Sequence, residues 1–131
     1  MTTRRRLRLQ VFPGTFAICR LEPGAAVPPW IAVGSFLSVT RTPAELSIVC
    51  EQETIPQDVR CERGWKCIAV EGPLPFSETG VLASLAAPLA DAEVSIFAIS
   101  TFDTDYVLVQ EVHLQRAMET LAAAGHQVPR W

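Results

Sequence analysis

The sequence lacks the features that mark the common kinds of metal, nucleotide and covalent chemistry. Its four cysteines form no CxxC pair, and no histidine stands at a zinc-ligand spacing from them. A phosphate-binding loop of the GxxxxGK type is absent, and no nucleophile accompanies a plausible base. We therefore expect no metal site, no cofactor and no catalytic residues.

Long apolar runs and excess positive charge are also missing. No stretch reaches the ~18 apolar residues that span a membrane, and no signal-peptide segment follows the first arginines. The formal net charge of −3 argues against nucleic acid as the main partner. We interpret the basic cluster Arg4-Arg5-Arg6-Leu7-Arg8 as a solvated chain end. These absences favour a cytoplasmic protein that binds neither membrane nor nucleic acid.

The individual cysteines and histidines carry weak signals. Cys19 and Cys50 lie inside apolar runs, as small core residues do. Cys61 and Cys67 flank a short turn-like segment and could approach each other, either as a disulfide or, as is commoner in the cytoplasm, as reduced thiols. His113 and His126 adjoin the two ends of an expected helix, which predicts solvated or capping roles.

The residues that are present indicate an α+β fold. With 49% apolar residues, a chain of 131 residues can bury a sizeable core. Alternating or β-branched runs predict strands, and apolar residues at helical spacing predict helices. The expected strands cover residues 7–11, 15–21, 35–40, 45–51, 65–71, 95–100 and 106–110, and the expected long helices cover 77–91 and 113–124. Shorter helices are expected within 25–33 and after Pro56, and Ser77 or Thr79 is the expected cap of the first long helix.

The order of these elements predicts two related halves. From Trp65 onward it reads β, α, β, β, α, with residues 127–128 as a final edge strand, which is the ferredoxin-like βαββαβ arrangement. The first half reads as a degenerate copy of it. We therefore expect an N-terminal half over residues 1–63 and a C-terminal domain over 64–131, with antiparallel sheets and helices on one face.

The connection between the last two strands is longer and more acidic than a hairpin requires. The segment Thr101-Phe102-Asp103-Thr104-Asp105 carries two carboxylates, whereas a tight hairpin uses two residues such as Asn-Gly. Two explanations stay open for these aspartates. They contact a polar guest, or they cap turns by bonding to nearby backbone.

Three stretches of the sequence resemble a known family. They are residues 36–42 with 45–50 (FLSVTRT and ELSIVC), residues 76–82 (FSETGVL) and residues 96–109 (IFAISTFDTDYVLV). The chain resembles the ACT-type small-molecule-binding domains in their tandem bacterial form. It is similar to the regulatory domains of aspartate kinases and to the animal cytosolic arginine sensor.

The resemblance implies a non-catalytic regulatory protein that binds an amino acid where two ACT units meet. Backbone N–H groups at a helix start bind anions, and Gly80, Val81 and Leu82 lie at such a start. Carboxylates near that start are suited to hold the ammonium, or a basic side chain, of the guest. The full set of candidate ligand-binding residues is Glu78, Gly80, Val81, Leu82, Thr101, Asp103 and Asp105, with Ser38 and Thr40 from the first half.

Two other functions are compatible with the same residues. One is a protein-interaction module with a vestigial pocket. The other is an enzyme that uses Glu78 with Asp103 or Asp105 as acid and base, although no nucleophile or metal spacing supports it. The high apolar content of so small a chain also leads us to expect a homodimer.

Overall fold

The computed structural model describes residues 6–31 and 33–129, and it divides the chain into two compact units. Unit 2 is Phe12–Trp65, and unit 1 combines the segment up to Val11 with the chain from Lys66 onward. The expected boundary at residues 63 and 64 lies close to the end of unit 2, but the segment up to Val11 groups with unit 1. Arg4 and Arg5 of the basic cluster lie outside the described residues.

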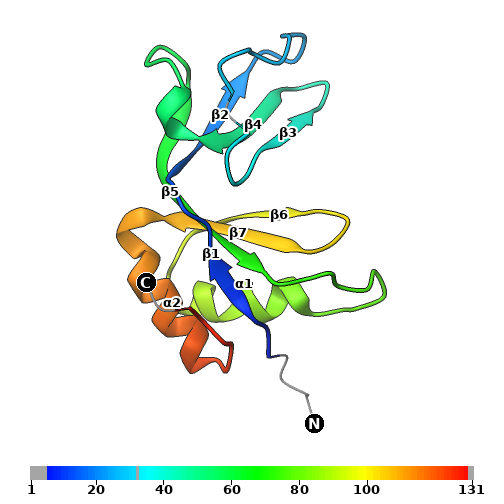
Figure 1. Ribbon diagram of the computed structural model, residues 1–131, viewed down its shortest axis with the longest axis vertical. Helices are drawn as coiled ribbons and strands as arrows, with labels where there is room; N and C mark the ends of the chain where they lie inside the picture. The colour runs from blue at the N-terminus through cyan, green and yellow to red at the C-terminus, as the bar shows by residue number, and fades with distance from the viewer. Residues whose placement is uncertain (1–5, 32, 130–131) are drawn as a thin grey trace. The chain divides into compact units, whose positions relative to one another are not determined.

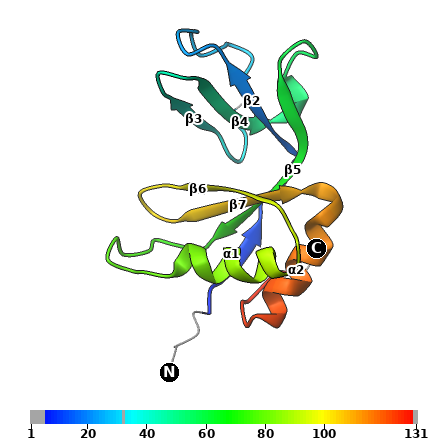
Figure 2. The ribbon, with the colours of Figure 1, turned by 180° about the vertical axis from the view of Figure 1, so that it is seen from behind.

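Unit 1 holds four strands and two α-helices. The strands are β1 (Leu9–Val11), the second half of β5 (Cys61–Val70), β6 (Ile96–Ser100) and β7 (Asp105–Gln110), in the spatial order β1-β5-β7-β6. The helices are α1 (Val81–Asp91) and α2 (Leu114–Ala123), and a short 3₁₀ helix, η2 (Glu111–His113), precedes α2. Both α-helices lie on one face of this sheet, as Figures 1 and 2 show. The expected ferredoxin-like arrangement is confirmed.

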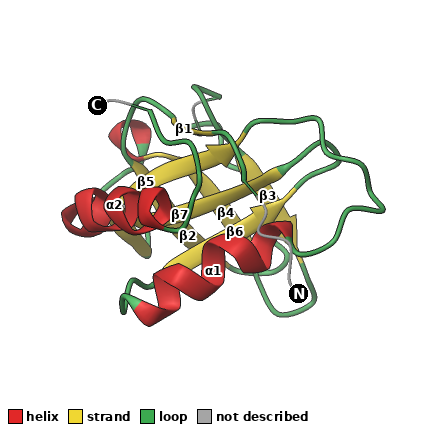
Figure 3. Ribbon diagram, turned by 90° about the horizontal axis from the view of Figure 1, so that it is seen from below, coloured by secondary structure: helices red, strands yellow, loops and turns green. Residues whose placement is uncertain are grey.

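The core of unit 1 lies between this sheet and the two helices. Apolar residues at helical spacing in α1 and α2 are buried, and strand residues of alternating position meet them. The helices cover the sheet side by side in the view of Figure 3. The fully buried side chains of this core include Ile68, Leu85, Leu89, Val107 and Leu121.

The N-terminal strand β1 takes the place expected for a strand after α2. It pairs antiparallel with β5, with Leu9 opposite Val70 and Val11 opposite Ile68. The expected edge strand at residues 127–128 is reduced to one bridge, in which Gln127 pairs in parallel with Arg8. The strand beside β5 is thus supplied by the other end of the chain.

His126 fixes the N-terminal segment to α1. Its side chain is 5% exposed, its Nδ1 accepts a hydrogen bond from Leu7 N at 3.1 Å, and its Nε2 lies 3.0 Å from Ser84 O. Because Nδ1 accepts from a backbone N–H, Nε2 is the ring nitrogen that donates to Ser84 O. The expectation of a solvated or capping His126 was wrong, because the histidine joins two segments that are distant in sequence.

Helix α1 begins later than the sequence suggested. Gly80 is its N-cap, with a left-handed φ of 80°, and no side chain caps the helix. The expectation of a cap by Ser77 or Thr79 was therefore wrong, since Ser77 lies in a turn and Thr79 precedes the N-cap Gly80. Pro88 lies inside the last turns of the helix, as the sequence indicated.

Unit 2 is an antiparallel sheet without an α-helix in its described residues. Its strands are β2 (Phe16–Leu21), β3 (Ser38–Arg41), β4 (Leu46–Glu51) and the first half of β5, in the order β3-β4-β2-β5. One 3₁₀ helix, η1 (Gln52–Thr54), precedes Pro56, whereas a turn follows it. The short helices expected within 25–33 and after Pro56 are not found in the described residues, so this half is degenerate as a copy of unit 1.

The cysteines carry no disulfide. Cys61 and Cys67 belong to the same strand, β5, where six residues of extended chain separate them by about 20 Å. The idea that they approach each other across a turn was wrong, because Gly64, between them, continues the strand.

Candidate ligand-binding site

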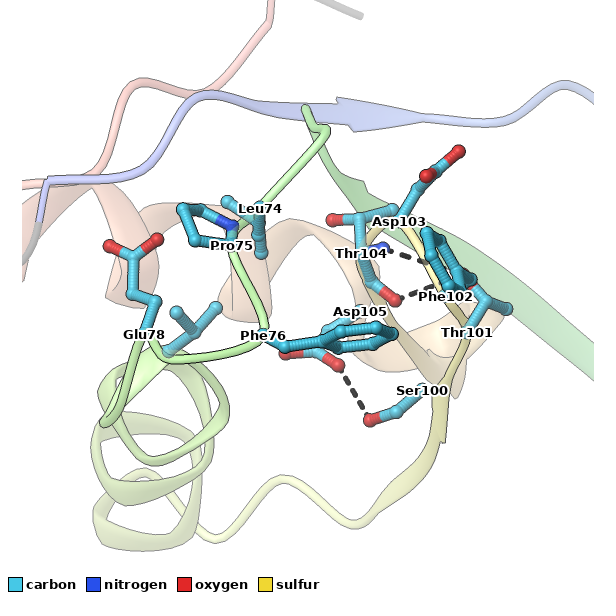
Figure 4. A pocket seen from close by; sticks show the side chains of 11 residues that line it. Leu74, Pro75, Phe76, Glu78, Ser100, Thr101, Phe102, Asp103, Thr104 and Asp105 are labelled. Carbon is cyan, nitrogen blue, oxygen red and sulfur yellow. Dashed lines mark hydrogen bonds between the residues drawn. The ribbon is translucent and has the colours of Figure 1, made fainter.

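Unit 1 contains a cavity of about 250 Å³ beside the β6–β7 hairpin. The hairpin forms one wall, and the segment that leads into α1 forms the other, as Figure 4 shows. The lining residues are Leu74, Pro75, Phe76, Glu78, Val81, Ser100, Thr101, Phe102, Asp103, Thr104 and Asp105. The acidic connection singled out in the sequence thus lies at a cavity.

The tip of the hairpin is a tight turn closed by two threonines. Thr101 N donates to Thr104 O at 2.9 Å, and the Thr101 hydroxyl donates to the same oxygen at 3.1 Å. Phe102 and Asp103 occupy the two corners of this turn. The backbone and side chain of Thr101 therefore close the turn with the backbone of Thr104, and neither aspartate is needed for that purpose.

The hairpin tip is fastened by two short hydrogen bonds, one to the opposite wall and one to the end of β5. Leu74 N donates to Asp103 O at 2.6 Å, and the buried Thr104 hydroxyl donates to Val70 O at 2.6 Å. Gly72 permits this approach, because a Cβ there would stand 3.0 Å from Asp103 O. The cavity walls are thus held together by the protein itself, which favours a site formed before any guest arrives.

Asp105 presents its carboxylate to the cavity from the start of β7. The Ser100 hydroxyl, directly opposite on β6, donates to Asp105 Oδ1 at 2.5 Å. A carboxylate accepts several hydrogen bonds, so this one orients the group and leaves capacity for a guest. Asp105 therefore pairs across the strands with Ser100, and this bond is not that of a turn-capping residue.

The other two acidic residues lie on different sides of the cavity. Glu78 comes from the segment before α1, while Asp103 points outward from the hairpin tip, away from Asp105 (Figure 4). In the described residues, no group of three or more acidic, histidine or cysteine side chains is arranged to hold a metal ion. The carboxylates are spread along the cavity and do not converge on a single point.

The start of α1 supplies a donor surface to the same cavity. Val81, its first residue, lines the cavity, and Leu82 is half-buried behind it. The first N–H groups of an α-helix lack an intrahelical acceptor. In α1 the N-cap residue Gly80 has no side chain that could accept from them. Such groups, with the positive end of the helix dipole, are suited to bind a carboxylate.

Five of the nine predicted site residues line the cavity: Glu78, Val81, Thr101, Asp103 and Asp105. Gly80 and Leu82 adjoin it at the helix start. Ser38 and Thr40 belong to β3 of unit 2, where Ser38 is half-buried and Thr40 exposed, and their part in binding stays a prediction.

Two aromatic residues at the cavity were missed by the sequence reasoning. Phe76 and Phe102 are 75% and 77% exposed, and their rings meet edge to face with centroids 4.6 Å apart. The signal was available, since Phe102 stands between Thr101 and Asp103, and Phe76 follows a proline-rich break in the chain. Ser100 was missed because its bond to Asp105 depends on the strand register.

Comparisons with known proteins agree with this architecture. A family model described as the ACT domain matches residues 60–123, and a second model, described as an N-terminal domain, matches residues 14–58. The human cytosolic arginine sensor for mTORC1, subunit 1, is 34% identical over 95 residues, which cover 66% of this chain and 29% of the sensor. The chain therefore spans about three tenths of the length of the curated relatives it matches.

Solved structures give the same result over the whole chain. A crystal structure of a protein from Agrobacterium tumefaciens matches with a TM-score of 0.90 and 43% identity, covering 95% of this chain and 93% of that one. The ligand-free regulatory subunit of aspartate kinase from Thermus thermophilus matches with a TM-score of 0.57 and 12% identity, covering 85% and 93%. This second likeness shows a shared fold alone. On the family match and these relatives together, the chain belongs to the ACT domain family.

Proposed function

We propose that this protein is a non-catalytic regulatory protein that binds an amino acid in the cavity of unit 1. The observation that carries the proposal is the presence, in one cavity, of the Asp105 carboxylate and the first residue of α1, Val81, which follows the glycine N-cap. An amino acid has an ammonium and a carboxylate on the same carbon. The cavity offers an acceptor for the first and donors for the second.

The binding mode follows from these two surfaces. The guest carboxylate lies against the N–H groups of Val81 and Leu82, and the guest ammonium donates to Asp105, while Glu78 on the α1 side is an acceptor for a second basic group of the guest. Asp103 and Thr101 border the opening. A contribution from Ser38 and Thr40 is part of the proposal and is tested separately by substitution.

We propose a basic amino acid as the first ligand to test. The cavity lining carries three carboxylates and no Lys or Arg, so it favours a guest with surplus positive charge. The relative named as an arginine sensor supports the same choice. A basic side chain would reach the carboxylates that the α-ammonium leaves unused.

A thermal-shift screen of the twenty amino acids and ornithine tests this function. A ligand that binds only the folded state stabilises it by about 2.7 kcal/mol at a concentration of 100 times Kd. We expect arginine, lysine or ornithine to raise the melting temperature in a saturable manner. If no amino acid shifts the transition at millimolar concentration, the proposed function is wrong.

The exposed aromatic pair favours a second candidate function, a protein-interaction module. Phe76 and Phe102 present two phenyl rings to solvent at the cavity mouth, and exposed apolar groups that lie together often mark a contact surface. In this alternative the same loops bind a partner protein and the cavity stays empty. Alanine at both positions would then abolish partner capture, whereas amino-acid binding would be undetectable in either form.

We further propose a cytoplasmic homodimer. In the described part of unit 1, β6 is the outermost strand, and its sequence IFAIS carries no charge, so its edge is open to pairing with another strand. None of the helices in residues 6–31 and 33–129 has the length and apolarity needed to cross a membrane. Light scattering that finds only monomer at micromolar concentration would contradict the dimer.

A further inference from the structure

Three of the four thiols gather on one face of the unit 2 sheet. Cys19 in β2 stands directly opposite Cys61 in β5, while Cys50 in β4 stands opposite Ala17, two residues along β2 from Cys19. Residues two apart on a strand share a face, so all three side chains enter the same apolar cluster. The proposed ligand cavity, which belongs to unit 1, makes no use of them.

The register makes Cys19 and Cys61 a pair that a disulfide can join. Arg20 N donates to Arg60 O at 3.0 Å, and these two residues face each other, so they form a hydrogen-bonded pair of the antiparallel ladder. The neighbouring pair, Cys19 and Cys61, is then a non-hydrogen-bonded one, with Cα atoms about 4.5 Å apart. Disulfides span Cα separations of about 4.4–6.8 Å, so no backbone movement is needed.

Cys50 is less well placed for a bond to Cys19. It stands diagonally across the β2–β4 pair, and diagonal neighbours are about 7–8 Å apart, beyond the usual span of a disulfide. Cys67 lies in unit 1, on the other half of β5. The strand register therefore favours the pair Cys19–Cys61, although Cys19 also hydrogen-bonds with Cys50.

The two members of the pair differ in their surroundings. Cys61 is half-buried at the start of β5, where solvent reaches it, whereas Cys19 is 1% exposed. The pKa of Cys19 is raised well above its ordinary value, first by its hydrogen bond with Cys50 and then by burial. Cys61 is therefore the thiol that meets an oxidant, and Cys19 is the thiol that resolves the product.

We propose that Cys61 and Cys19 are a modification site at which a hydroperoxide oxidises two thiols to a cross-strand disulfide. The Cys61 thiolate attacks one peroxide oxygen, the O–O bond breaks, and the departing hydroxide takes a proton from solvent to become water. The Cys19 sulfur then attacks the sulfenic sulfur, so that an S–S bond forms and an S–O bond breaks. The Cys19 proton leaves with the hydroxide as a second molecule of water. Two thiols and one hydrogen peroxide thus give one disulfide and two waters.

The consequence of the bond is local to unit 2. It ties the start of β5 to β2 and closes a loop of about 40 residues, which restricts the unfolded chain more than a short loop would. The oxidised protein should therefore melt at a higher temperature than the reduced protein, and a dithiol reductant should reverse the change.

Peptide mapping of the oxidised protein tests the proposal. The folded full-length chain is treated with hydrogen peroxide, its remaining thiols are alkylated, and the digest is analysed by mass spectrometry. We expect the number of alkylated cysteines to fall from the four of the reduced protein to two, with the Cys19 and Cys61 peptides linked.

Serine variants provide the controls. Cys67→Ser and Cys50→Ser should still form the bond, whereas Cys61→Ser and Cys19→Ser should not, and circular dichroism verifies that each variant folds. If Cys19→Ser does not fold, two other results identify the bond. They are the peptide map of the wild type and the behaviour of Cys61→Ser, a substitution at a half-buried position. Four free thiols in the folded protein, under conditions that oxidise the unfolded chain, would overturn the proposal. A wild-type bond that includes Cys50 or joins two chains would overturn it as well.

Discussion

The substitution Asp105→Asn tests whether the Asp105 carboxylate binds a ligand or has only a structural role. The substitution keeps the size of the side chain and keeps an oxygen that accepts the Ser100 hydroxyl, now 2.5 Å from Asp105 Oδ1. It removes only the negative charge and one pair of acceptor sites. The hairpin should therefore fold as before, and any change in affinity reports on the guest.

The expected loss follows from the position of the group. Asp105 is half-buried in a cavity, where a hydrogen bond to a charged partner contributes about 1.5–3 kcal/mol. Affinity for the best amino acid found by the thermal-shift screen should fall about ten- to a hundredfold. Calorimetric titration of the wild type and Asp105→Asn measures it directly.

Asp103→Asn is the matched control. Its carboxylate is exposed and points away from Asp105, so solvent screens it, and we expect a loss of about threefold or less. Glu78→Gln should weaken binding in the same direction as Asp105→Asn. The two effects should be non-additive if both carboxylates hold one ammonium. Equal affinities for wild type and Asp105→Asn, with unchanged melting, would refute the binding role of the hairpin.

Three further substitutions test the supports of unit 1. Thr104→Val removes the buried hydroxyl that fastens the hairpin and leaves a backbone carbonyl unpaired, which should cost about 1–3 kcal/mol in urea denaturation and weaken ligand binding. His126→Leu removes both of the ring's hydrogen bonds, so hydrogen exchange in β1 should accelerate markedly while β6 stays protected. Burial raises the pKa of Cys67 to about 12, so the stability that its neutral thiol contributes is complete below the unfolded pKa near 8.5 and declines as pH rises toward 12. Above the unfolded pKa near 8.5, wild-type stability should therefore fall relative to Cys67→Val by about 1.4 kcal/mol per pH unit. If stability depends on pH in the same way in both proteins, the buried Cys67 thiol is not the cause.

Local patterns predicted most of the secondary structure. The strands near residues 16–21, 46–51 and 96–110 follow from alternation and β-branched residues, and α2 follows from apolar residues at helical spacing. The start of α1 was misplaced because Ser77 and Thr79 have the side chains of caps, whereas the backbone turns at Gly80 in a left-handed conformation. Residue type alone does not distinguish these alternatives.

The features that sequence reasoning missed depend on pairing between distant segments. Leu9 lies opposite Val70 and Leu7 N bonds to His126, and neither contact leaves a periodic trace in the chain. The cysteines show the same limit. Cys19 and Cys61 are neighbours only because β2 and β5 adopt one particular register, and a shift of one residue would turn the side chains to opposite faces.

The cavity was predicted in part. The polar insert between two apolar strands identified Asp103 and Asp105, since carboxylates have little reason to interrupt a sheet. The exposed Phe76 and Phe102 were missed because an aromatic residue is expected to be buried. Their exposure reflects the turns in which they lie. Each turn is closed by its own backbone hydrogen bond, and the bond from Leu74 N to Asp103 O joins the two walls.

The position of β1 has a consequence for the order in which the chain folds. Unit 1 needs residues 7–11, which precede unit 2 in the chain, and residues 66–127, which follow it. Unit 2 is formed from the residues between them, so it can fold before β1 pairs with the second half of β5. Closing the sheet of unit 1 is then a late step that joins two distant segments, and such a long-range closure slows folding relative to a local hairpin. Deletion of the first eleven residues would leave unit 2 intact and would leave one side of β5 in unit 1 without its neighbour.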